Sequence, residues 1–198
     1  HSLNVFAEEI HKLYDELKGN HDNEYLKLII LYLFFSLDRL TDYNCAFSQW
    51  KHTGVQQTPL FRSNRMGILW NYPEANVIGK KAICWTNAVD ITAQSVQVTL
   101  NKFCEPGRAI QKNAEVSDPL LKDLLVSTDP PYYNNIPYAD LMDFFYVWMR
   151  RALRQSLPDL LATIAVPKAE ELVATPYRHG GKDAAAQFFL TGMGAAMR

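Results

Sequence analysis

LLVSTDPPY, residues 124–132, decides the fold prediction for this chain. Leu124 to Thr128 is a short apolar run of the kind that forms a buried strand, and a proline-rich turn follows it directly. Open α/β sheets bind their ligands at the carboxyl ends of the strands. The stretch therefore predicts an α/β fold with a ligand site at Asp129-Pro130-Pro131-Tyr132, whereas the same tetrapeptide in an irregular loop would be only a rigid turn.

The tetrapeptide contains the groups that methylation of a planar exocyclic amine requires. Such a nitrogen is a poor nucleophile because its lone pair is delocalised, so acceptors must hold its N–H bonds while it pyramidalises. Asp129 and the carbonyl group of Pro130 are candidate acceptors, and Pro130 and Pro131 restrict the backbone that carries them. Tyr132 is a candidate stacking surface, and stacking contributes about 1–3 kcal/mol per base. We predict that these four residues are catalytic.

Longer phrases around the motif resemble a known family. They are STDPPYYNNIPYADLMDFFYVWMRR (127–151), VPKAEELVATPYRHGGKDAAA (166–186), LFFSLDRLTDYN (33–44) and MGILWNYPEAN (66–76). These phrases are similar to the predicted adenine-specific DNA methylases that carry a zinc ribbon, in the order in which that family has them. The resemblance implies a Rossmann-like methyltransferase fold and transfer of a methyl group from S-adenosylmethionine to the exocyclic amino group of adenine in DNA.

The sequence also departs from that family. A glycine-rich cofactor loop is expected after the first strand of the fold, and none of the nine glycines forms that pattern at a strand end. We therefore expect the chain to be a middle fragment that lacks N- and C-terminal segments of a parent protein. Such a fragment would contain only part of the methyltransferase fold and would be inactive alone.

The resemblance also suggests cofactor and DNA contacts. In the family, the loop after the strand that corresponds to 108–112 contacts the adenine of the cofactor through an acidic residue, and here Asn113 occupies that place. Asn113 and Asp129 are thus the predicted S-adenosylmethionine ligands. The predicted substrate-binding residues fall in a polar aromatic loop and in a cationic loop rich in proline and glycine, which suits a phosphate track. They are Tyr133, Asn134, Tyr138, Lys168, Arg178 and His179.

Each of these substrate assignments has a structural alternative. Tyr138 packs equally well on the helix predicted to follow it, from residue 139 or 140 to about 155. The cationic loop is equally consistent with a solvated loop. Phe145 and Trp148 lie on an apolar stripe of the predicted helix, so we expect them to be packing residues. Asp140 and Asp143 in its first turn favour the helix dipole, which predicts a capping role.

Hydrophobic spacing divides the chain into a mainly helical part, residues 1–105, and an α/β part, residues 106–198, which the resemblance implies is a partial methyltransferase domain. Apolar residues recur at helical spacing from Leu3 to Leu17, and Gly19 follows as a stop. A second helix is expected to start near Asp22 and to be apolar on nearly every face. Residues 41–76 look irregular, residues 79–103 predict a helix, and residues 183–197 predict another. Trp70, Asn71, Glu74 and Asn76 match a family phrase without a physical role.

Composition limits the possible classes of protein. The chain has 198 residues, 48% of them hydrophobic, which suits a folded protein with a sizeable core. Its net charge of −1 neither supports nor excludes DNA binding. Three widely spaced cysteines, Cys45, Cys84 and Cys104, suit neither a disulfide framework nor a zinc site. The apolar run at 28–37 is too short to span a membrane, and with no signal peptide we expect a cytoplasmic protein.

Three functions remain open at this point. The first is a DNA adenine methyltransferase. The second is a methyltransferase for another planar amine, such as guanine in RNA or cytosine in DNA, because proline-proline-tyrosine motifs serve such enzymes as well. The third is a DNA-recognition or assembly module in which the motif has no catalytic role.

Overall fold

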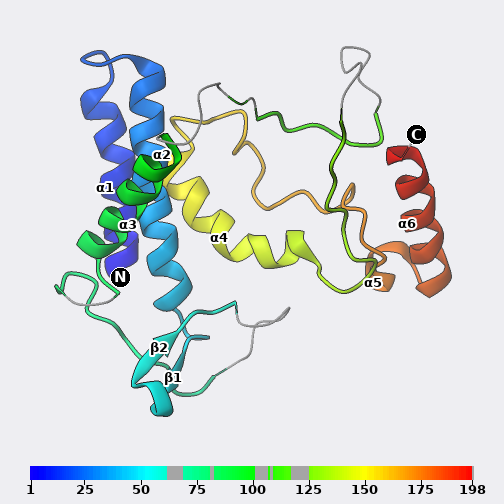
Figure 1. The fold of residues 1–198 in the computed structure, drawn as a ribbon, viewed down its shortest axis with the longest axis horizontal. Helices are drawn as coiled ribbons and strands as arrows, with labels where there is room; N and C mark the ends of the chain where they lie inside the picture. Colours follow the sequence, from blue (N-terminus) through cyan, green and yellow to red (C-terminus); the bar gives the residue numbers. More distant parts are fainter. Residues whose placement is uncertain (62–68, 81–82, 101–106, 108, 117–124, 198) are drawn as a thin grey trace. The chain divides into compact units, whose positions relative to one another are not determined.

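The computed structural model describes residues 1–61, 69–80, 83–100, 107, 109–116 and 125–197 (Figure 1). The chain forms two compact units. The first contains His1–Cys104 and Leu141–Val166, and the second contains Glu105–Asp140 and Pro167–Arg198. The sequence prediction placed residues 141–166 with the second part. They pack in the first unit because their apolar side chains join the helical core there.

Two long helices form the centre of the first unit. Helix α1 covers Ser2–Leu17 and α2 covers Asn23–Tyr43. Asp22 caps α2, since its carboxylate accepts a hydrogen bond of 2.9 Å from the backbone N–H of Tyr25. Gly19 has φ of +94° in the turn between the helices, a conformation that glycine adopts without steric cost. Both helices confirm the prediction from apolar spacing.

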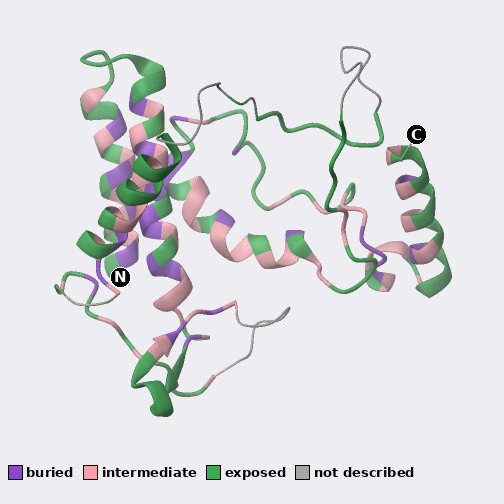
Figure 2. Cartoon of the chain, viewed as in Figure 1, coloured by how far each residue is buried: buried purple, intermediate pink, exposed green. Residues whose placement is uncertain are grey.

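The core of the first unit lies between these helices and the segments that pack on them (Figure 2). Helices α1 and α2 each contribute buried side chains at intervals of three or four residues, which is the spacing of one helix face. They are Leu3, Ala7, Ile10 and Tyr14 of α1 and Leu26, Ile30, Phe34, Leu37 and Leu40 of α2. Helix α2 packs against α1 and against α3, Trp85–Leu100, while its residues Leu28 and Phe35 remain exposed.

Helix α3, Trp85–Leu100, packs against α2 and confirms the helix predicted at 79–103. The ring of its first residue, Trp85, stacks on Phe6 of α1 with centroids 4.6 Å apart. Trp148 of helix α4, Tyr138–Leu153, is partly buried against the same core, as predicted, and Phe145 packs on Phe61 with ring centroids 5.1 Å apart. Aromatic side chains from three separate stretches of sequence thus pack against the core.

A β-hairpin occupies part of the stretch that the sequence predicted to be irregular. Strands β1, Gln49–Lys51, and β2, Gln56–Thr58, pair antiparallel, with a short 3₁₀ turn, η1, at His52–Gly54 between them. The hairpin is attached to the end of α2, because the backbone N–H of Leu60 donates to the carbonyl of Asp42 at 2.7 Å. Its strands are short and rich in glutamine, so they show neither the length nor the alternation of a typical strand.

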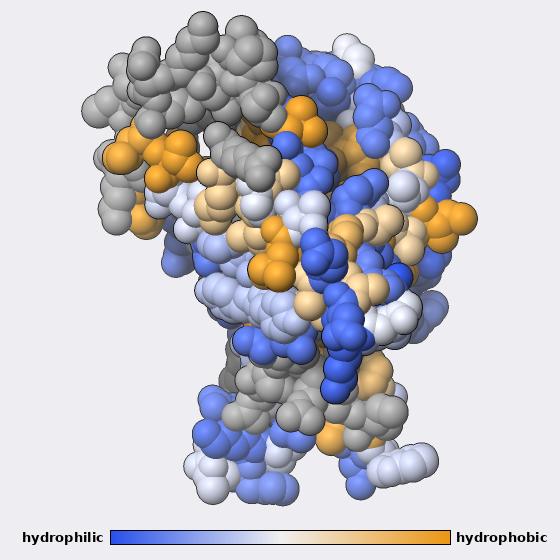
Figure 3. All heavy atoms as spheres, turned by 90° about the vertical axis from the view of Figure 1, so that its right-hand side faces the viewer, coloured by the Kyte–Doolittle hydropathy of each residue, from blue (hydrophilic) through white to orange (hydrophobic). Residues whose placement is uncertain are grey.

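Helices and irregular segments make up the described part of the second unit. Helix α4 covers Tyr138–Leu153, and its residues from Leu141 onward belong to the first unit. The short α5, Pro176–His179, leads through Gly180 and Gly181 into α6, Lys182–Ala196, which confirms the predicted last helix. Helix α6 buries Ala185 and Gly192. On the face shown in Figure 3, exposed hydrophobic side chains lie among hydrophilic ones.

The two predicted strands of the α/β domain are not formed by the residues that the structure describes. Residues 109–112 and 125–128 have no regular structure and are exposed, while Arg108 and Leu124 lie outside the described residues. A strand is stabilised by hydrogen bonds to a neighbour, and no such neighbour is present among the described residues of this unit. The Rossmann-like fold class therefore stays a prediction.

Within the described ranges, no helix is both long enough and apolar enough to cross a membrane. Cys84 is buried and Cys45 is partly exposed, both as free thiols. Cys104 lies outside the described residues.

Candidate functional site

Asp129-Pro130-Pro131-Tyr132 lies in an irregular segment of the second unit that precedes α4. Asp129 is exposed, and so is Tyr132, at 52%. The Tyr132 hydroxyl donates a hydrogen bond of 3.1 Å to Oδ1 of Asp129. This bond to the carboxylate raises the pKa of the Tyr132 hydroxyl above its ordinary value. The two side chains that the sequence assigned to catalysis therefore contact each other and are accessible to a ligand.

A tight turn follows the motif directly. The backbone N–H of Asn135 donates to the carbonyl of Tyr132 at 3.0 Å, which closes a four-residue turn. Tyr133 in this turn has φ of +54°, in the left-handed region that glycine usually occupies. A non-glycine residue held in this conformation costs on the order of 1–3 kcal/mol, and such residues cluster at active sites and ligand clamps.

Two contacts hold the turn in this strained form. The carbonyl of Tyr133 accepts a hydrogen bond of 2.9 Å from the backbone N–H of Ala174. The Tyr133 ring meets Phe189 of α6 edge to face, with centroids 5.2 Å apart. These contacts fix the C-terminal side of the motif to the segment before α5 and to α6. Tyr133, predicted to bind substrate, is thus an anchor of the motif in this structure.

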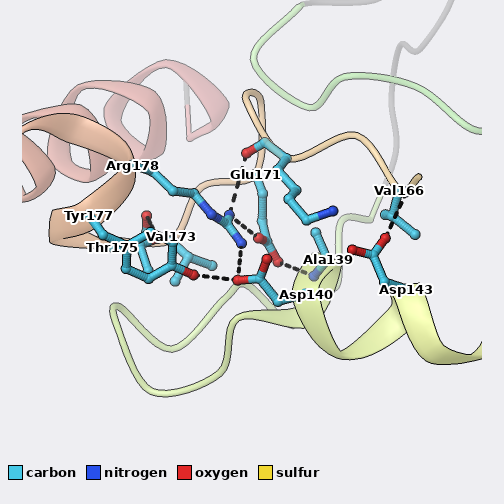
Figure 4. Close-up of polar contacts among 10 residues, drawn as sticks. Ala139, Asp140, Asp143, Val166, Glu171, Val173, Thr175, Tyr177 and Arg178 are labelled. Carbon is cyan, nitrogen blue, oxygen red and sulfur yellow. Dashed lines mark hydrogen bonds and ion pairs between the residues drawn. The ribbon is translucent and has the colours of Figure 1, made fainter. Parts of the chain in front are cut away.

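An ion-pair network centres on Arg178 of α5 (Figure 4). Its Nη1 is 2.5 Å from Oε2 of Glu171, and its Nη2 is 2.6 Å from Oδ2 of Asp140. Tyr177 also donates its hydroxyl to Oδ2 of Asp140. The other oxygen of Glu171 accepts from the backbone N–H of Ala139 at 2.9 Å, so a carboxylate caps the start of α4. The network joins the start of α4, the helix that follows the Asp129–Tyr132 motif, to α5.

The network shifts the pKa values of its members in a consistent way. Burial alone would raise the pKa of Asp140, but the hydrogen bonds from Tyr177 and Arg178 outweigh it and hold that pKa below its ordinary value. The hydrogen bond to Asp140 raises the pKa of Tyr177. Burial opposes the charge on Arg178, yet its bonds to Glu171 and Asp140 raise its pKa overall. The guanidinium is therefore charged and committed to two carboxylates.

This commitment bears on the predicted phosphate track. The side chain of Arg178 is only 10% exposed, so the structure favours a positioning role over contact with a phosphate. Nη1 of Arg178 also donates a hydrogen bond of 3.4 Å to the backbone carbonyl of Lys168. His179 stacks on Phe188 of α6 with ring centroids 4.1 Å apart, and its Nε2 is buried. His179 is thus part of the packing between α5 and α6.

The remaining predicted residues are less closely connected. Oδ1 of Asn113 accepts a hydrogen bond of 2.9 Å from the backbone N–H of Glu115, so this amide oxygen stabilises its own turn. No contact between Asn113 and Asp129 is present among the described residues. Asn134 is exposed in the turn after the motif. Tyr138 is 42% exposed at the first position of α4.

The chain has no match in the comparisons with known proteins. Neither protein-family models, nor the curated proteins, nor the solved structures contain a similar protein. The resemblance to DNA methylases thus rests on the quoted phrases, and the functional argument rests on the geometry of the loop.

Sequence reasoning missed part of this site. Glu171 and Tyr177 were not singled out, and Asp140 was expected only to favour the helix dipole. The available signal was two adjacent acidic residues, Glu170 and Glu171, inside a segment otherwise read as cationic. The partners Asp140 and Arg178 are 38 residues apart, so no local pattern joins them.

Proposed function

We propose that the Asp129-Pro130-Pro131-Tyr132 loop is the catalytic segment for methyl transfer to the exocyclic amino group of adenine in DNA. The observation that carries this proposal is the exposed pair of Asp129 and Tyr132, joined by their 3.1 Å hydrogen bond within a proline-stiffened loop. An acceptor and an aromatic ring presented together are what a planar amine needs for binding and activation.

Each side chain of the pair has a distinct role in this proposal. The Asp129 carboxylate accepts a hydrogen bond from the amino group and so favours the pyramidal nitrogen on which the new bond forms. The Tyr132 ring stacks on the base, while its hydroxyl restrains the carboxylate. Since its bond to Asp129 raises the pKa of the hydroxyl, Tyr132 remains a donor at neutral pH. Both roles need the exposure that the two side chains have.

The surroundings of the loop support the proposal through pre-organisation. The strained turn at Tyr133 and its bond to Ala174 hold the backbone just after the motif. Arg178 joins Asp140, in the helix that follows this turn, to Glu171, which lies three residues before Ala174. A catalytic group that is held before the substrate arrives needs little reorganisation during the reaction.

The proposed methyl donor is S-adenosylmethionine, which would supply an electrophilic methyl group. The nitrogen–carbon bond would form as the carbon–sulfur bond breaks, S-adenosylhomocysteine would leave, and the amino nitrogen would release one proton to solvent. Asn113 and Asp129 are the residues that would hold it, and Asn113 fits in part. Because Oδ1 of Asn113 is used by its own turn, the amide nitrogen is the atom left to donate to a ring nitrogen of the cofactor's adenine. The glycine-rich loop expected for the rest of the cofactor is not in the sequence.

The test combines binding and product analysis. S-adenosylmethionine is titrated calorimetrically into the chain and into Asp129→Asn, and methylated bases are identified by mass spectrometry after incubation with adenine-containing DNA. Because the expected glycine-rich loop is not in the sequence, we expect little or no product from the wild type alone. Binding of S-adenosylmethionine by the wild type is therefore the primary readout, and any N6-methyladenine that forms should fall at least tenfold with the variant. The matched control is Asp159→Asn, which changes an exposed aspartate of the first unit.

The product distinguishes the alternatives. Methylated cytosine in DNA or methylated guanine in RNA would replace adenine as the target and keep the catalytic role of the loop. DNA binding without any methylated base and without S-adenosylmethionine binding would refute the proposal for this chain and favour a recognition module.

A further inference from the structure

A cavity of about 1010 Å³ lies in the first unit, at the C-terminal end of α2. Its walls come from α2, from the β1–β2 hairpin, from the segment at 73–80 and from the start of α3. The volume is at the upper end of the range of about 300–1,000 Å³ that is typical of small-molecule sites. None of the residues that line it belongs to the proposed catalytic loop.

The lining combines aromatic rings, side-chain amides and cations. Tyr43 and Trp50 supply the rings, and Trp50 is 46% exposed. Asn76 and Asn87 supply exposed amides. Oδ1 of Asn76 accepts a hydrogen bond of 3.2 Å from the backbone N–H of Ile78, so its amide nitrogen is the atom left to donate, while the amide of Asn87 can donate and accept. The charged side chains that line the cavity in the described part of the chain are Arg39, Lys80 and Glu74. The cations thus outnumber the single carboxylate there.

Arg39 lies beside an aromatic wall of the cavity. Its guanidinium carbon is 5.9 Å from the centre of the Tyr43 ring, within the range of a cation–π contact. Burial raises the pKa of Asp42, and the backbone hydrogen bonds from Phe61 and Leu60 and the charge of Arg39 offset this only in part. Arg39 itself is exposed, so its planar group is accessible to an anion that enters the cavity.

The walls are held together before any ligand binds. Nε2 of Gln57 donates to the carbonyl of Tyr43 and, at 3.1 Å, to the carbonyl of Pro73. Oδ1 of Asn44 accepts a hydrogen bond of 3.2 Å from the backbone N–H of Ala75. The end of α2, the hairpin and the segment at 73–75 are thereby linked. A preformed wall lowers the conformational entropy that binding must overcome.

The hairpin contributes an independent sign of function. Val55, which lines the cavity, has φ of +46° in the turn between the strands. A β-branched residue is a genuine outlier at positive φ, and such strain clusters at ligand clamps. Glycine would adopt this conformation freely, but valine places an apolar side chain on the cavity wall.

We infer that this cavity binds a nucleotide unit, meaning a nucleobase with an attached phosphate. The rings of Tyr43 and Trp50 offer stacking surfaces, the amides of Asn76 and Asn87 suit the edge of a base, and Arg39 and Lys80 suit a phosphate. The unit is supplied either as a free nucleotide or as an unpaired residue of a nucleic acid strand. This inference goes beyond the proposed catalytic function and uses different residues.

The test is calorimetric titration of the chain with adenosine 5′-monophosphate, adenosine, inorganic phosphate and a single-stranded oligodeoxyadenylate. We expect adenosine 5′-monophosphate to bind and Trp50→Leu to weaken it by roughly tenfold or more, because stacking is lost. The matched control is Trp70→Leu. Trp70 is 95% exposed and does not line the cavity, so its replacement should leave the affinity unchanged.

A second variant tests the phosphate contacts. The double variant Arg39→Gln, Lys80→Gln should weaken the binding of adenosine 5′-monophosphate several-fold and leave the affinity for adenosine nearly unchanged. Tighter binding of the oligonucleotide than of the mononucleotide would identify a strand as the source, and equal affinity would identify a free nucleotide. Circular dichroism checks that each variant is folded.

Two outcomes would overturn the inference. One is the absence of binding by both the mononucleotide and the oligonucleotide, or binding of inorganic phosphate alone. The other is binding that neither Trp50→Leu nor the double cation variant weakens. The two proposals can be distinguished by their variants. If Asp129→Asn abolishes S-adenosylmethionine binding and Trp50→Leu does not, the result supports the proposed catalytic site and says nothing for the cavity.

Discussion

Asp38 of α2 should make the protein less stable at neutral pH than at acidic pH. Its Oδ1 is buried and has no hydrogen-bond partner among the described residues. Burial raises the pKa of Asp38 to about 6, and the charge of Asp42 one turn later adds to the effect. We therefore expect Asp38→Asn to stabilise the protein at pH 7.5, because it removes a charge that the folded state holds unfavourably.

The size and sign of the effect follow from the two pKa values. A pKa of about 6 against an ordinary value of 3.8 corresponds to at most about 3 kcal/mol at neutral pH. Asp38 is only partly buried, so solvent screening reduces this to about 1–2 kcal/mol. Below pH 3.8 the carboxyl is protonated in both states, and the penalty grows as pH rises towards 6. The advantage of Asp38→Asn should thus vanish near pH 4.

The assay is urea denaturation followed by circular dichroism at pH 4, 6 and 7.5, for the wild type and two variants. The matched control is Asp90→Asn, which replaces an exposed aspartate on α3 and should change the free energy of unfolding by less than about 0.5 kcal/mol at each pH. The reasoning is refuted if Asp38→Asn destabilises the protein at pH 7.5, or if its effect is the same at pH 4 and at pH 7.5.

Three further predictions concern the second unit. Arg178→Met should lower the free energy of unfolding by about 3 kcal/mol, because it leaves two carboxylates without their ion-pair partner. Adding Glu171→Gln to this variant should restore part of the lost stability, and urea denaturation measures both effects. Tyr133→Val should be about 1 kcal/mol less stable than Tyr133→Asn, since both lack the ring and only asparagine tolerates the positive φ; equal stabilities would argue against strain at this turn. Gly192→Ala should change the free energy of unfolding by less than about 1 kcal/mol, because its methyl group would displace the ends of the Leu172 and Glu115 side chains and so offset the gain in helix propensity. Gly194→Ala, with open space around it, should stabilise α6 by up to about 1 kcal/mol, and thermal melting separates the two.

The helices were predictable because their physical signals are local. In α1 the buried Leu3, Ala7 and Ile10 repeat at helical spacing, and the side chain of Asp22 caps α2 where the sequence suggested a start. The hairpin at 49–58 was missed because its strands are short and mostly polar. It is held by Leu60 and Gln57, whose bonds reach back to the end of α2.

The candidate site also combines contacts between residues close in sequence with contacts between residues far apart. The contact between Asp129 and Tyr132 joins residues three apart, so it depends on local sequence, and the catalytic role of the pair stays a prediction. The network around Arg178 depends on residues far apart in sequence, so composition suggested a phosphate contact where the fold supplies two carboxylates. The predicted strand at 124–128 was inferred from apolar residues alone, and a strand also depends on a neighbour that such a pattern does not reveal.

The return of residues 141–166 to the first unit has a consequence for deletion mapping. Because each unit is assembled from two separate stretches of sequence, no single cut divides the chain into the two complete units. A truncation that ends at residue 104 removes Tyr146, Leu153 and Leu161 from the helical core. Loss of activity in such a truncated chain could not be attributed to the loss of the proposed catalytic loop, because incomplete packing of the core would also cause it. Functions should therefore be assigned by point substitution or by joining the paired stretches with a linker.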